Sequence, residues 1–600
     1  MNLSSFILIF TMTITFCPLD RAQLLLSLKN SSSIFMANNN RLSTVDSITN
    51  DLRIHRQHYS DRRYKLSSKQ QQQQKRNSTN TVAMKLSHRI KQSKSMISSS
   101  SSSLPTPGKW EPIWNELFPR PKSISSVRFY LYSRLNPDNG HELCIDDHES
   151  IKQSNYNPNK RTIFLINGWQ DNRLFARWVR DAIRLLLLRD DQNVIFVGWR
   201  SLNELFVAAM IIQSYSLYLA RFINFLKSKY HLNGEQIHCI GHSLGGFMCG
   251  FAGNITFIGR ITVMDAGPRP YFQRKPSHQR LNRFQAGFMD VIHSDFHPIF
   301  SLGLTIPYGD IDFFPNSGTP QPGCWQDKLY KPMKELTDSN GDGPLTSLFQ
   351  FPRYLLFCSH YRSHEWFFES IWNQQCQFIG VLCPNYQMFI DGECGCEDIW
   401  IDGHGETTCA LMGYDAEYAI LKQGLTKFSP QGKWYLKTSD FIDQTKHHCQ
   451  YQYQLIVKLG QFIPHNNIGN DNDSTTTTTT TTVVVTIVTK SNDDNKMSNN
   501  QIILNEKLYP RHYPQLRPNH RLSKLIIRPH SLPLKRIEYI LVSLQSSSNE
   551  IRLQSNLFIT ISWIKLAPIH VVQNEPLFFC HLDHYIWPGK SNMMKPCSTH

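Results

Sequence analysis

Short apolar runs alternate with longer amphipathic stretches through the middle of the chain. The short runs are rich in β-branched residues, and they cover 162–167 (TIFLIN), 193–197 (NVIFV), 236–240 (QIHCI) and 260–264 (RITVM). Runs of this kind are typical of strands that are buried on both faces of a parallel sheet. Residues 172–188 and 205–230, which lie between them, carry the periodicity of crossover helices. The alternation predicts an α/β doubly wound sheet.

The pattern changes near residue 447. Tyr451, Tyr453 and Leu455 alternate with polar residues, as in a half-buried antiparallel strand, and the strand-like character resumes at 537–544 and 557–564. We therefore expect a β module over residues 447–600. Residues 466–521, which include the threonine run 475–482, are predicted to be a low-complexity insertion in that module.

The first hundred residues have another composition. The apolar run at 6–17 has the length of a signal-peptide core, which predicts a signal peptide over residues 1–22 and a secreted protein. Residues 23–105 are basic, rich in Ser, Asn and Gln, and have no sustained apolar period, so we expect a disordered segment there. No later stretch reaches about 18 uninterrupted apolar residues, and a second membrane span is not expected. The remaining residues, 106–446, form the predicted catalytic domain.

Charge and cysteine content refine this picture. Lys and Arg outnumber Asp and Glu by 63 to 47 among the 600 residues, giving a net charge of +16, but much of the excess lies near the two chain ends. Such tails suit acidic glycans or lipid head groups, and we expect no nucleic-acid partner. Fourteen cysteines favour an oxidising compartment. Because Cys394 and Cys396 have no partner cluster at zinc-ligand spacing, no metal site is expected.

The most specific motif is the sequence GHSLG at residues 241–245. A G-x-S-x-G sequence between a strand and a helix is the nucleophile elbow of α/β-hydrolases. Here a strand-like run precedes it, and the following stretch contains Gly245, Gly246, Gly250 and Gly253, which would leave room for a strained turn. The motif predicts Ser243 as the nucleophile, and the residue after it, Leu244, as one backbone donor of the oxyanion hole.

A nucleophilic serine needs a base and an acid. Asp265 stands at the carboxyl end of the predicted strand 260–264, where it would lie beside the elbow; Asp290 and Asp295 are competing acids. The chain has 24 histidines, and their spacing does not select the base.

Seven segments in order resemble blocks of the pancreatic lipase family, which includes lipoprotein, hepatic and endothelial lipases and phospholipases A1. They are NGWQDN, VGWR, IHCIGHSLGGFMCGFAG, GRITVMD, FMDVIHSD, DFFPNSGTPQPGC and CSHYRSHEWFFESI, and the similarity covers residues 108–460 and, weakly, 530–600. The resemblance implies an α/β-hydrolase fold, with His360 as the base, His364 as the fallback and Asp265 as the acid. The second oxyanion donor would be Trp169, although Asn167 replaces the family's histidine. The loop that begins at Asp265 also differs from the family pattern, because this chain has Asp-Ala-Gly where relatives have Asp-Pro-Ala.

The resemblance also implies disulfides. The pairs would be Cys324 with Cys358, Cys383 with Cys394, Cys396 with Cys409, and Cys580 with Cys597. The first pair would close a lid over residues 325–357. Cys239 and Cys249, near the elbow, are interpreted as small buried hydrophobic residues.

Calcium binding is not expected. Relatives with a structural calcium have acidic side chains in the segment that matches Ser277, Arg280, Asn282 and Gln285, and this chain has no carboxylate at these positions. The catalysis predicted here needs no cofactor.

The sequence thus predicts an extracellular lipase with a Ser243, Asp265 and His360 triad. Its expected substrates are acylglycerols or phospholipids at a lipid interface, with phospholipase A1 activity and non-enzymatic lipid binding as the alternatives. The β module resembles a PLAT domain, which implies docking to lipid or to a colipase-like protein. Among the N-x-S/T acceptors, Asn254 is the favoured glycosylation site.

Overall fold

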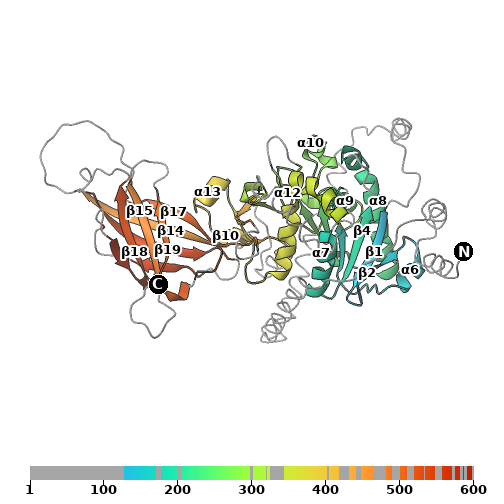
Figure 1. Cartoon of the computed structure of the whole chain (residues 1–600), viewed down its shortest axis with the longest axis horizontal. Coiled ribbons are helices and arrows are strands. Elements are labelled where there is room, and N and C mark those ends of the chain that lie inside the picture. The colour runs from blue at the N-terminus through green and yellow to red at the C-terminus, as the bar shows by residue number, and fades with distance from the viewer. Residues whose placement is uncertain are drawn as a thin grey trace.

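The computed structural model of the chain describes residues 127–169, 177–199, 205–296, 302–318, 321–324, 344–396, 398–401, 404–417, 432–440, 447–464, 481–489, 501–509, 516, 519–532, 534–546, 557–570, 575–580, 586 and 591–597. The side chains of 344–356 are among those left out of this description. The predicted signal peptide and basic segment, and residues 325–343 of the predicted lid, lie outside the described residues. Figure 1 shows an α/β part joined end to end to an all-β part.

The α/β part is built on an 11-stranded sheet. Its order is β12-β9-β13-β8-β7-β6-β5-β3-β4-β1-β2, and the strands from β13 to β4 run parallel, with antiparallel strands at both edges. The strands are β1 (Val127–Ser133), β2 (Asn136–Leu143), β3 (Thr162–Ile166), β4 (Asn193–Trp199), β5 (Ile237–His242), β6 (Arg260–Met264), β7 (Phe288–Ile292), β8 (Ile311–Pro315), β9 (Ile379–Leu382), β12 (Cys409–Leu411) and β13 (Lys433–Leu436).

Helices cover both faces of this sheet. The helices are α6 (His148–Lys152), α7 (Arg177–Arg189), α8 (Leu205–Tyr230), α9 (Leu244–Gly253), α10 (Arg269–Phe272), α12 (Pro344–Trp372) and α13 (Tyr386–Ile390). Apolar residues of α8 and α9 pack against one face, and those of α7 and α12 pack against the other. Each face of the sheet therefore has its own hydrophobic core, which explains why the central strands read as continuous apolar runs.

One helix in the described part of the chain, α8, is long and apolar enough to cross a membrane by length and composition. Half of its most apolar window is buried, and Phe222, Ile223 and Leu226 lie in the core beside the sheet. Packing in the fold accounts for the buried half of this window.

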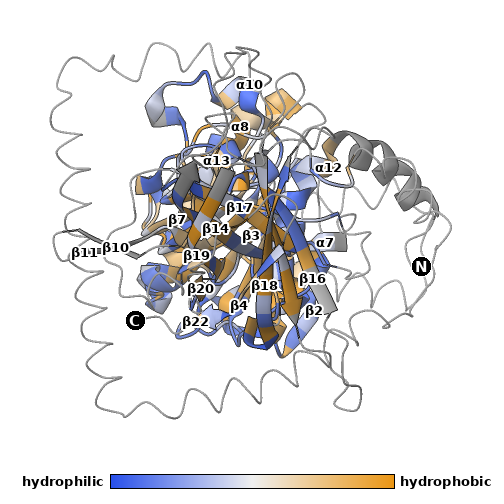
Figure 2. Cartoon of the chain, turned by 90° about the vertical axis from the view of Figure 1, so that its left-hand side faces the viewer, coloured by the Kyte–Doolittle hydropathy of each residue, from blue (hydrophilic) through white to orange (hydrophobic). Residues whose placement is uncertain are grey.

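The all-β part consists of two facing sheets. The five-stranded sheet has the order β17 (Arg521–Arg528), β14 (Tyr451–Pro464), β19 (Leu557–Pro568), β20 (Leu577–Cys580) and β22 (Pro596–Cys597). The four-stranded sheet has the order β16 (Gln501–Leu508), β15 (Thr481–Thr489), β18 (Ile537–Ser546) and β21 (Ser591–Met594). Leu455, Val485 and Ile561 meet in one core between the sheets, as in a β-sandwich. Figure 2, viewed from this end, shows apolar residues concentrated on the strands.

The predicted insertion 466–521 needs correction, because β15 and β16 lie within it. Thr481–Thr489 pairs with β16 on one side and β18 on the other. Val483, Val485 and Ile487 are fully buried in the sandwich core. The threonine run suggested low complexity, but β-branched Thr and Val favour a strand once partner strands are available.

The two parts share an apolar contact. Phe389 and Tyr435 of the α/β part cluster with Leu525 and Ile569 of the sandwich. Near this cluster a small hairpin, β10 (Asp398–Ile401) and β11 (His404–Thr407), branches from the α/β part. The buried side chain of Gln452 on β14 donates to the carbonyl of Ile379 at 3.2 Å. The sandwich is therefore packed on the α/β part through both apolar and hydrogen-bonded contacts.

Candidate active site

The predicted nucleophile lies on a strained turn between a strand and a helix. β5 ends at His242, α9 begins at Leu244, and Ser243 between them has φ 55° and ψ −121°. The Ser243 N–H donates to the carbonyl of Met264 on the neighbouring strand at 2.9 Å. A non-glycine residue in this conformation costs about 1–3 kcal/mol and is found mostly at functional sites. The turn has the conformation that the G-x-S-x-G motif predicted.

The glycines of the motif are required by close backbone packing. A Cβ atom on Gly245 would lie 2.5 Å from the carbonyl oxygen of Ile166 on β3. A Cβ atom on Gly241 would lie 2.4 Å from the carbonyl carbon of Gly245, on the other side of the turn. Any larger residue would push the helix away from the sheet, so these glycines bring α9 close enough for the sharp turn.

The predicted base and acid are joined by a hydrogen bond. His360 Nδ1 donates to Asp265 Oδ2 at 2.5 Å, and both residues are buried. The other carboxylate oxygen, Oδ1, accepts from the N–H groups of Ser294 at 2.8 Å and Asp295 at 3.2 Å. Because Nδ1 carries the proton in this arrangement, Nε2 is the basic nitrogen of the neutral ring.

Ser243 and His360 line the same cleft. Its remaining lining is mostly apolar and consists of Trp169, Leu205, His242, Leu302, Phe357 and Tyr361. Residues from β5, α8 and α12 therefore meet at the carboxyl edge of the parallel strands, which is the usual location of ligand sites in open α/β sheets.

The competing residues have other surroundings. His364 stacks on Trp178, with 4.7 Å between ring centroids, and burial lowers its pKa to about 4. Asp290 forms a buried ion pair with Arg260 at 2.9 Å. The carboxylate of Asp295 accepts from the N–H of Leu302 at 3.0 Å, although it lies within 4.8 Å of the Asp265 and His360 ligand atoms. None of these three residues lines the cleft, whereas His360 lines it together with Ser243.

The predicted oxyanion donors, Leu244 and Trp169, are next to Ser243 or follow a residue that is. Leu244 is the first residue of α9, where helix N–H groups have no intrahelical acceptor. A Cβ atom on Gly168 would lie 3.0 Å from the Ser243 Cβ, so the backbone before Trp169 passes directly next to the serine. Asn167, which replaces the family's histidine, donates from Nδ2 to the Gly168 carbonyl at 2.9 Å. The replacement side chain thus braces the loop that carries the second donor.

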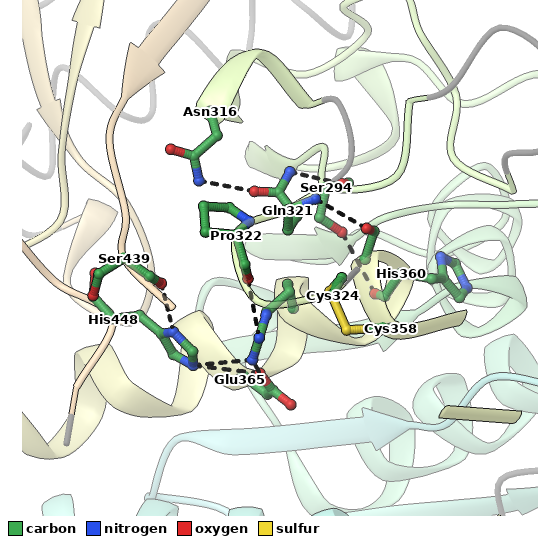
Figure 3. Close-up of a disulfide and its surroundings, with 12 residues drawn as sticks. Ser294, Asn316, Gln321, Pro322, Cys324, Cys358, His360, Glu365, Ser439 and His448 are labelled. Atoms are coloured by element: carbon green, nitrogen blue, oxygen red, sulfur yellow. Dashed lines mark hydrogen bonds and ion pairs between the residues drawn. A yellow bond between two sulfur atoms is a disulfide. The ribbon is translucent and has the colours of Figure 1, made fainter. Parts of the chain in front are cut away.

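A polar cluster behind the base connects α12 to the start of the sandwich (Figure 3). The buried Arg362 pairs with Glu365, donates to the Pro322 carbonyl at 3.2 Å and lies 3.4 Å from His448 Nε2. We call Arg362, Glu365 and His448 the junction cluster. Burial alone would raise the pKa of Glu365, but Arg362 and His448 outweigh burial and hold this pKa well below its usual range.

Sequence reasoning did not anticipate the junction cluster. The only signal for it was the position of Arg362, two residues after His360, because its partner His448 is 86 residues away in the chain. Glu369, also on α12, strengthens the same connection by accepting from the N–H groups of His448 at 2.8 Å and Cys449 at 2.9 Å.

The four disulfides implied by the resemblance are present in the structure. The pairs are Cys324 with Cys358, Cys383 with Cys394, Cys396 with Cys409, and Cys580 with Cys597. A fifth pair, Cys376 with Cys449, was not anticipated and ties the end of α12 to the junction with the sandwich.

The interpretation of Cys239 and Cys249 as separate hydrophobic residues is wrong. They are bonded to each other across the elbow, with Cα atoms 5.8 Å apart. Their spacing indicated no partner for either residue, because the strand-to-helix reversal that brings them together depends on the elbow's own geometry.

The segment that holds calcium in relatives does not fit a calcium ion here. Asn282 and Gln285 form a reciprocal capping box, in which Gln285 Oε1 accepts from the Asn282 N–H and the Asn282 side chain accepts from the Phe284 N–H. These oxygens serve local hydrogen bonds, and neither carries a formal charge, whereas calcium prefers carboxylate ligands.

Comparisons with known proteins identify the family. The lipase family profile matches residues 91–442. The pancreatic triacylglycerol lipase of Cavia porcellus is 33% identical over 344 residues, which span 56% of this chain and 68% of that protein. The pancreatic triacylglycerol lipase of Homo sapiens is 32% identical over 347 residues, which span 56% of this chain and 68% of that protein. The chain belongs to the pancreatic lipase family. Its large mixed sheet is accordingly that of an α/β-hydrolase.

Membership in the pancreatic lipase family does not by itself establish activity. The inactive pancreatic lipase-related protein 1 of Canis lupus familiaris is 31% identical over 340 residues, spanning 56% of this chain and 67% of that protein. Catalysis by this chain therefore depends on its own site residues.

Proposed function

We propose that this protein is a secreted lipase that hydrolyses the carboxylic ester bonds of acylglycerols at a lipid-water interface. The observation that carries the proposal is the shared cleft of Ser243 and His360, together with the hydrogen bond from His360 Nδ1 to Asp265. Six disulfides among the described residues suit an extracellular protein.

The proposed reaction follows from the roles of these groups. Ser243 Oγ attacks the ester carbonyl while His360 Nε2 takes its proton, and Asp265 stabilises the resulting imidazolium. The N–H groups of Leu244 and Trp169 would bind the negative oxygen of the tetrahedral intermediate. His360 then returns the proton to the leaving alcohol, and water releases the fatty acid from the acyl-enzyme by the same sequence of steps.

The lining of the cleft favours an acyl chain as part of the substrate. Trp169, Leu205, Leu302 and Phe357 present mainly carbon to the space beside Ser243. The disulfide between Cys324 and Cys358 closes the loop that we propose as the lid. A lid over residues 325–357 would expose apolar side chains on opening, which a lipid surface compensates at about 25 cal/mol per Å² buried. We therefore rank triacylglycerol above phospholipid, because a long lid leaves less room for a head group.

The remaining parts of the proposal concern the partners. The sandwich is proposed as a PLAT-like domain that docks on lipid, on a colipase-like protein or on an acidic glycan. Asn254 is exposed at the end of α9, which suits its proposed role as the glycan acceptor.

The test measures fatty-acid release from emulsified triacylglycerol and from phosphatidylcholine vesicles. Wild type should prefer the emulsion, and Ser243→Ala should lose about 10⁶-fold in turnover without a change in thermal unfolding. Residual Ser243→Ala activity within tenfold of wild type would reject the nucleophile. Faster release from vesicles would indicate a phospholipase A1. Lipid binding without release would support the non-enzymatic alternative.

A further inference from the structure

We propose that the disulfide between Cys239 and Cys249 positions the nucleophile of this enzyme, so that its loss lowers turnover and not only stability. The inference rests on the proposed function, because it concerns Ser243 as the attacking group. Cys239 lies in β5, Cys249 lies in α9, and the 10-residue separation between them encloses the whole GHSLG turn.

The enclosed turn has little intrinsic preference for its own conformation. Ser243 occupies a left-handed conformation at φ 55°, and its side chain makes no capping bond to the helix. The helix after it is short and includes Gly245, Gly246 and Gly250, residues that lower helix propensity because the unfolded glycine backbone has many conformations to lose.

Two glycines of this helix cannot be exchanged for better helix formers, because fixed backbone lies against them. A Cβ on Gly245 would lie 2.5 Å from the carbonyl oxygen of Ile166, and one on Gly253 would lie 2.0 Å from the carbonyl oxygen of Gln285. Close packing thus requires glycines, and glycines restrict the backbone conformation of this segment less than other residues would. A covalent bond across the turn restricts the same backbone without occupying any of the space that the glycines leave open.

The bond acts at the two ends that set the position of Ser243 Oγ. It joins the strand four residues before the serine to the helix six residues after it. The approach angle of α9 to β5 determines both the direction of Oγ and the place of the Leu244 N–H. Misplacement of a reacting group by about 1 Å can cost about 100-fold in rate, so a small rotation of α9 would reduce turnover strongly.

Burial makes the bond resistant to reductants in the folded protein. Both cysteines have 0% exposed surface and lie within the core between α8, α9 and the sheet. A dithiol can reach the sulfur atoms only when the elbow opens. The pair Cys580 and Cys597 offers a contrast, because it joins β20 to β22 in the sandwich and Cys580 is exposed.

The experiment compares two double variants with one control. Cys239→Ala/Cys249→Ala removes the elbow bond, and Cys239→Val/Cys249→Ala removes it while preserving apolar volume. Cys580→Ala/Cys597→Ala is the control. Thermal unfolding is recorded for each, together with kcat and KM on a dissolved short-chain ester and the rate of covalent labelling of Ser243 by diethyl p-nitrophenyl phosphate.

Both elbow variants should show kcat and labelling rates lower by about 10- to 100-fold, with KM within about twofold of wild type. The control should keep the kcat, the KM and the labelling rate of wild type. If the elbow variants retain wild-type kcat and labelling at a temperature below their unfolding transition, the bond is only a stabilising element and the inference is wrong.

Wild type itself provides a second measurement if the elbow variants do not fold. Folded protein is treated with a dithiol, alkylated and then labelled, and mass spectrometry identifies which cysteines and which serine are modified in each molecule. Molecules alkylated at Cys239 and Cys249 should label at least tenfold more slowly than molecules alkylated only at Cys580 and Cys597. Equal labelling would overturn the inference. Failure of the proposed function would look different, because untreated wild type would neither hydrolyse the ester nor be labelled at Ser243.

Discussion

The elbow and the base helix build the two halves of the candidate site in different ways. The elbow is held by main-chain contacts and by a disulfide between residues 10 apart in sequence. The proposed base is held by distant side chains: His360 donates to Asp265, 95 residues away, and the neighbouring Arg362 contacts His448, 86 residues away. The position of Ser243 therefore depends on local backbone geometry, whereas the position of His360 depends on the assembly of the whole domain.

This difference explains which residues a motif can reveal. The Ser243 turn requires glycines at fixed neighbouring positions, so its sequence is recognisable. Helix α12 places His360 and His364 one turn apart, and nothing in the helix itself tells the cleft residue from the one that stacks on Trp178.

The largest expected effect separates these two histidines. His360→Ala should reduce turnover on a dissolved ester by about 10⁶-fold, as for other triad members, because Ser243 then has no base. His364→Phe retains an aromatic ring against Trp178 and should keep turnover within about tenfold of wild type. Steady-state kinetics at pH 8 decide the point. If His364→Phe is the inactive variant, the base has been assigned one helical turn too early.

A second test removes the support of the base helix. Arg362→Met removes the buried arginine from beside Glu365, whose side chain is 29% exposed and keeps His448 nearby, and should lower the free energy of unfolding by about 1.5–3 kcal/mol. Arg184→Met is the matched control, because Arg184 pairs with Asp138 at the surface, with side chains 44% and 59% exposed, and should cost at most about 1 kcal/mol. Urea unfolding measures both changes. Equal losses of unfolding free energy in the two variants would show that the junction cluster stabilises the fold no more than a surface ion pair does.

The third prediction concerns acid stability. Burial lowers the pKa of His364 from 6.5 to about 4, so between these pH values the unfolded chain binds a proton that the folded protein does not. Stability should therefore fall as the pH drops below about 6.5, and the contribution of His364 at pH 4.5 should be about 2–3 kcal/mol. His364→Phe should lose less stability than wild type between pH 7.5 and 4.5 in urea unfolding. The same loss in both proteins would contradict this assignment.

The smallest expected effect is that of chelation. Because Asn282 and Gln285 bond to their own backbone neighbours, EGTA should leave the midpoint of thermal unfolding within about 1 °C. EGTA saturated with calcium serves as the control in the same calorimetric scans. A lower midpoint that added calcium restores would place a metal site elsewhere in the chain.

Much of the fold was predictable because each pattern reflects a local constraint. The runs that became β3, β4 and β6 were recognisable, since strands buried on both faces must be apolar throughout. The run near β5 was placed with a small error, because the strand extends to His242 inside the elbow motif. The composition of 466–521 was misleading, since the strand Thr481–Thr489 depends on partners from other parts of the chain.

The sequence by itself predicted Ser243 as the nucleophile and four strands of the parallel sheet, and the family resemblance implied Asp265 and His360 as acid and base and four disulfides. These features depend on residue types at short and regular spacing, or on motifs shared with relatives. Only the tertiary structure decided that His360 and not His364 lines the cleft with Ser243, how the junction cluster ties α12 to the sandwich, and that Cys239 bonds Cys249. Each of these contacts forms only after strands and helices have packed. Packing is driven by the burial of apolar surface, so it brings together residues whose spacing in the sequence does not mark them as neighbours.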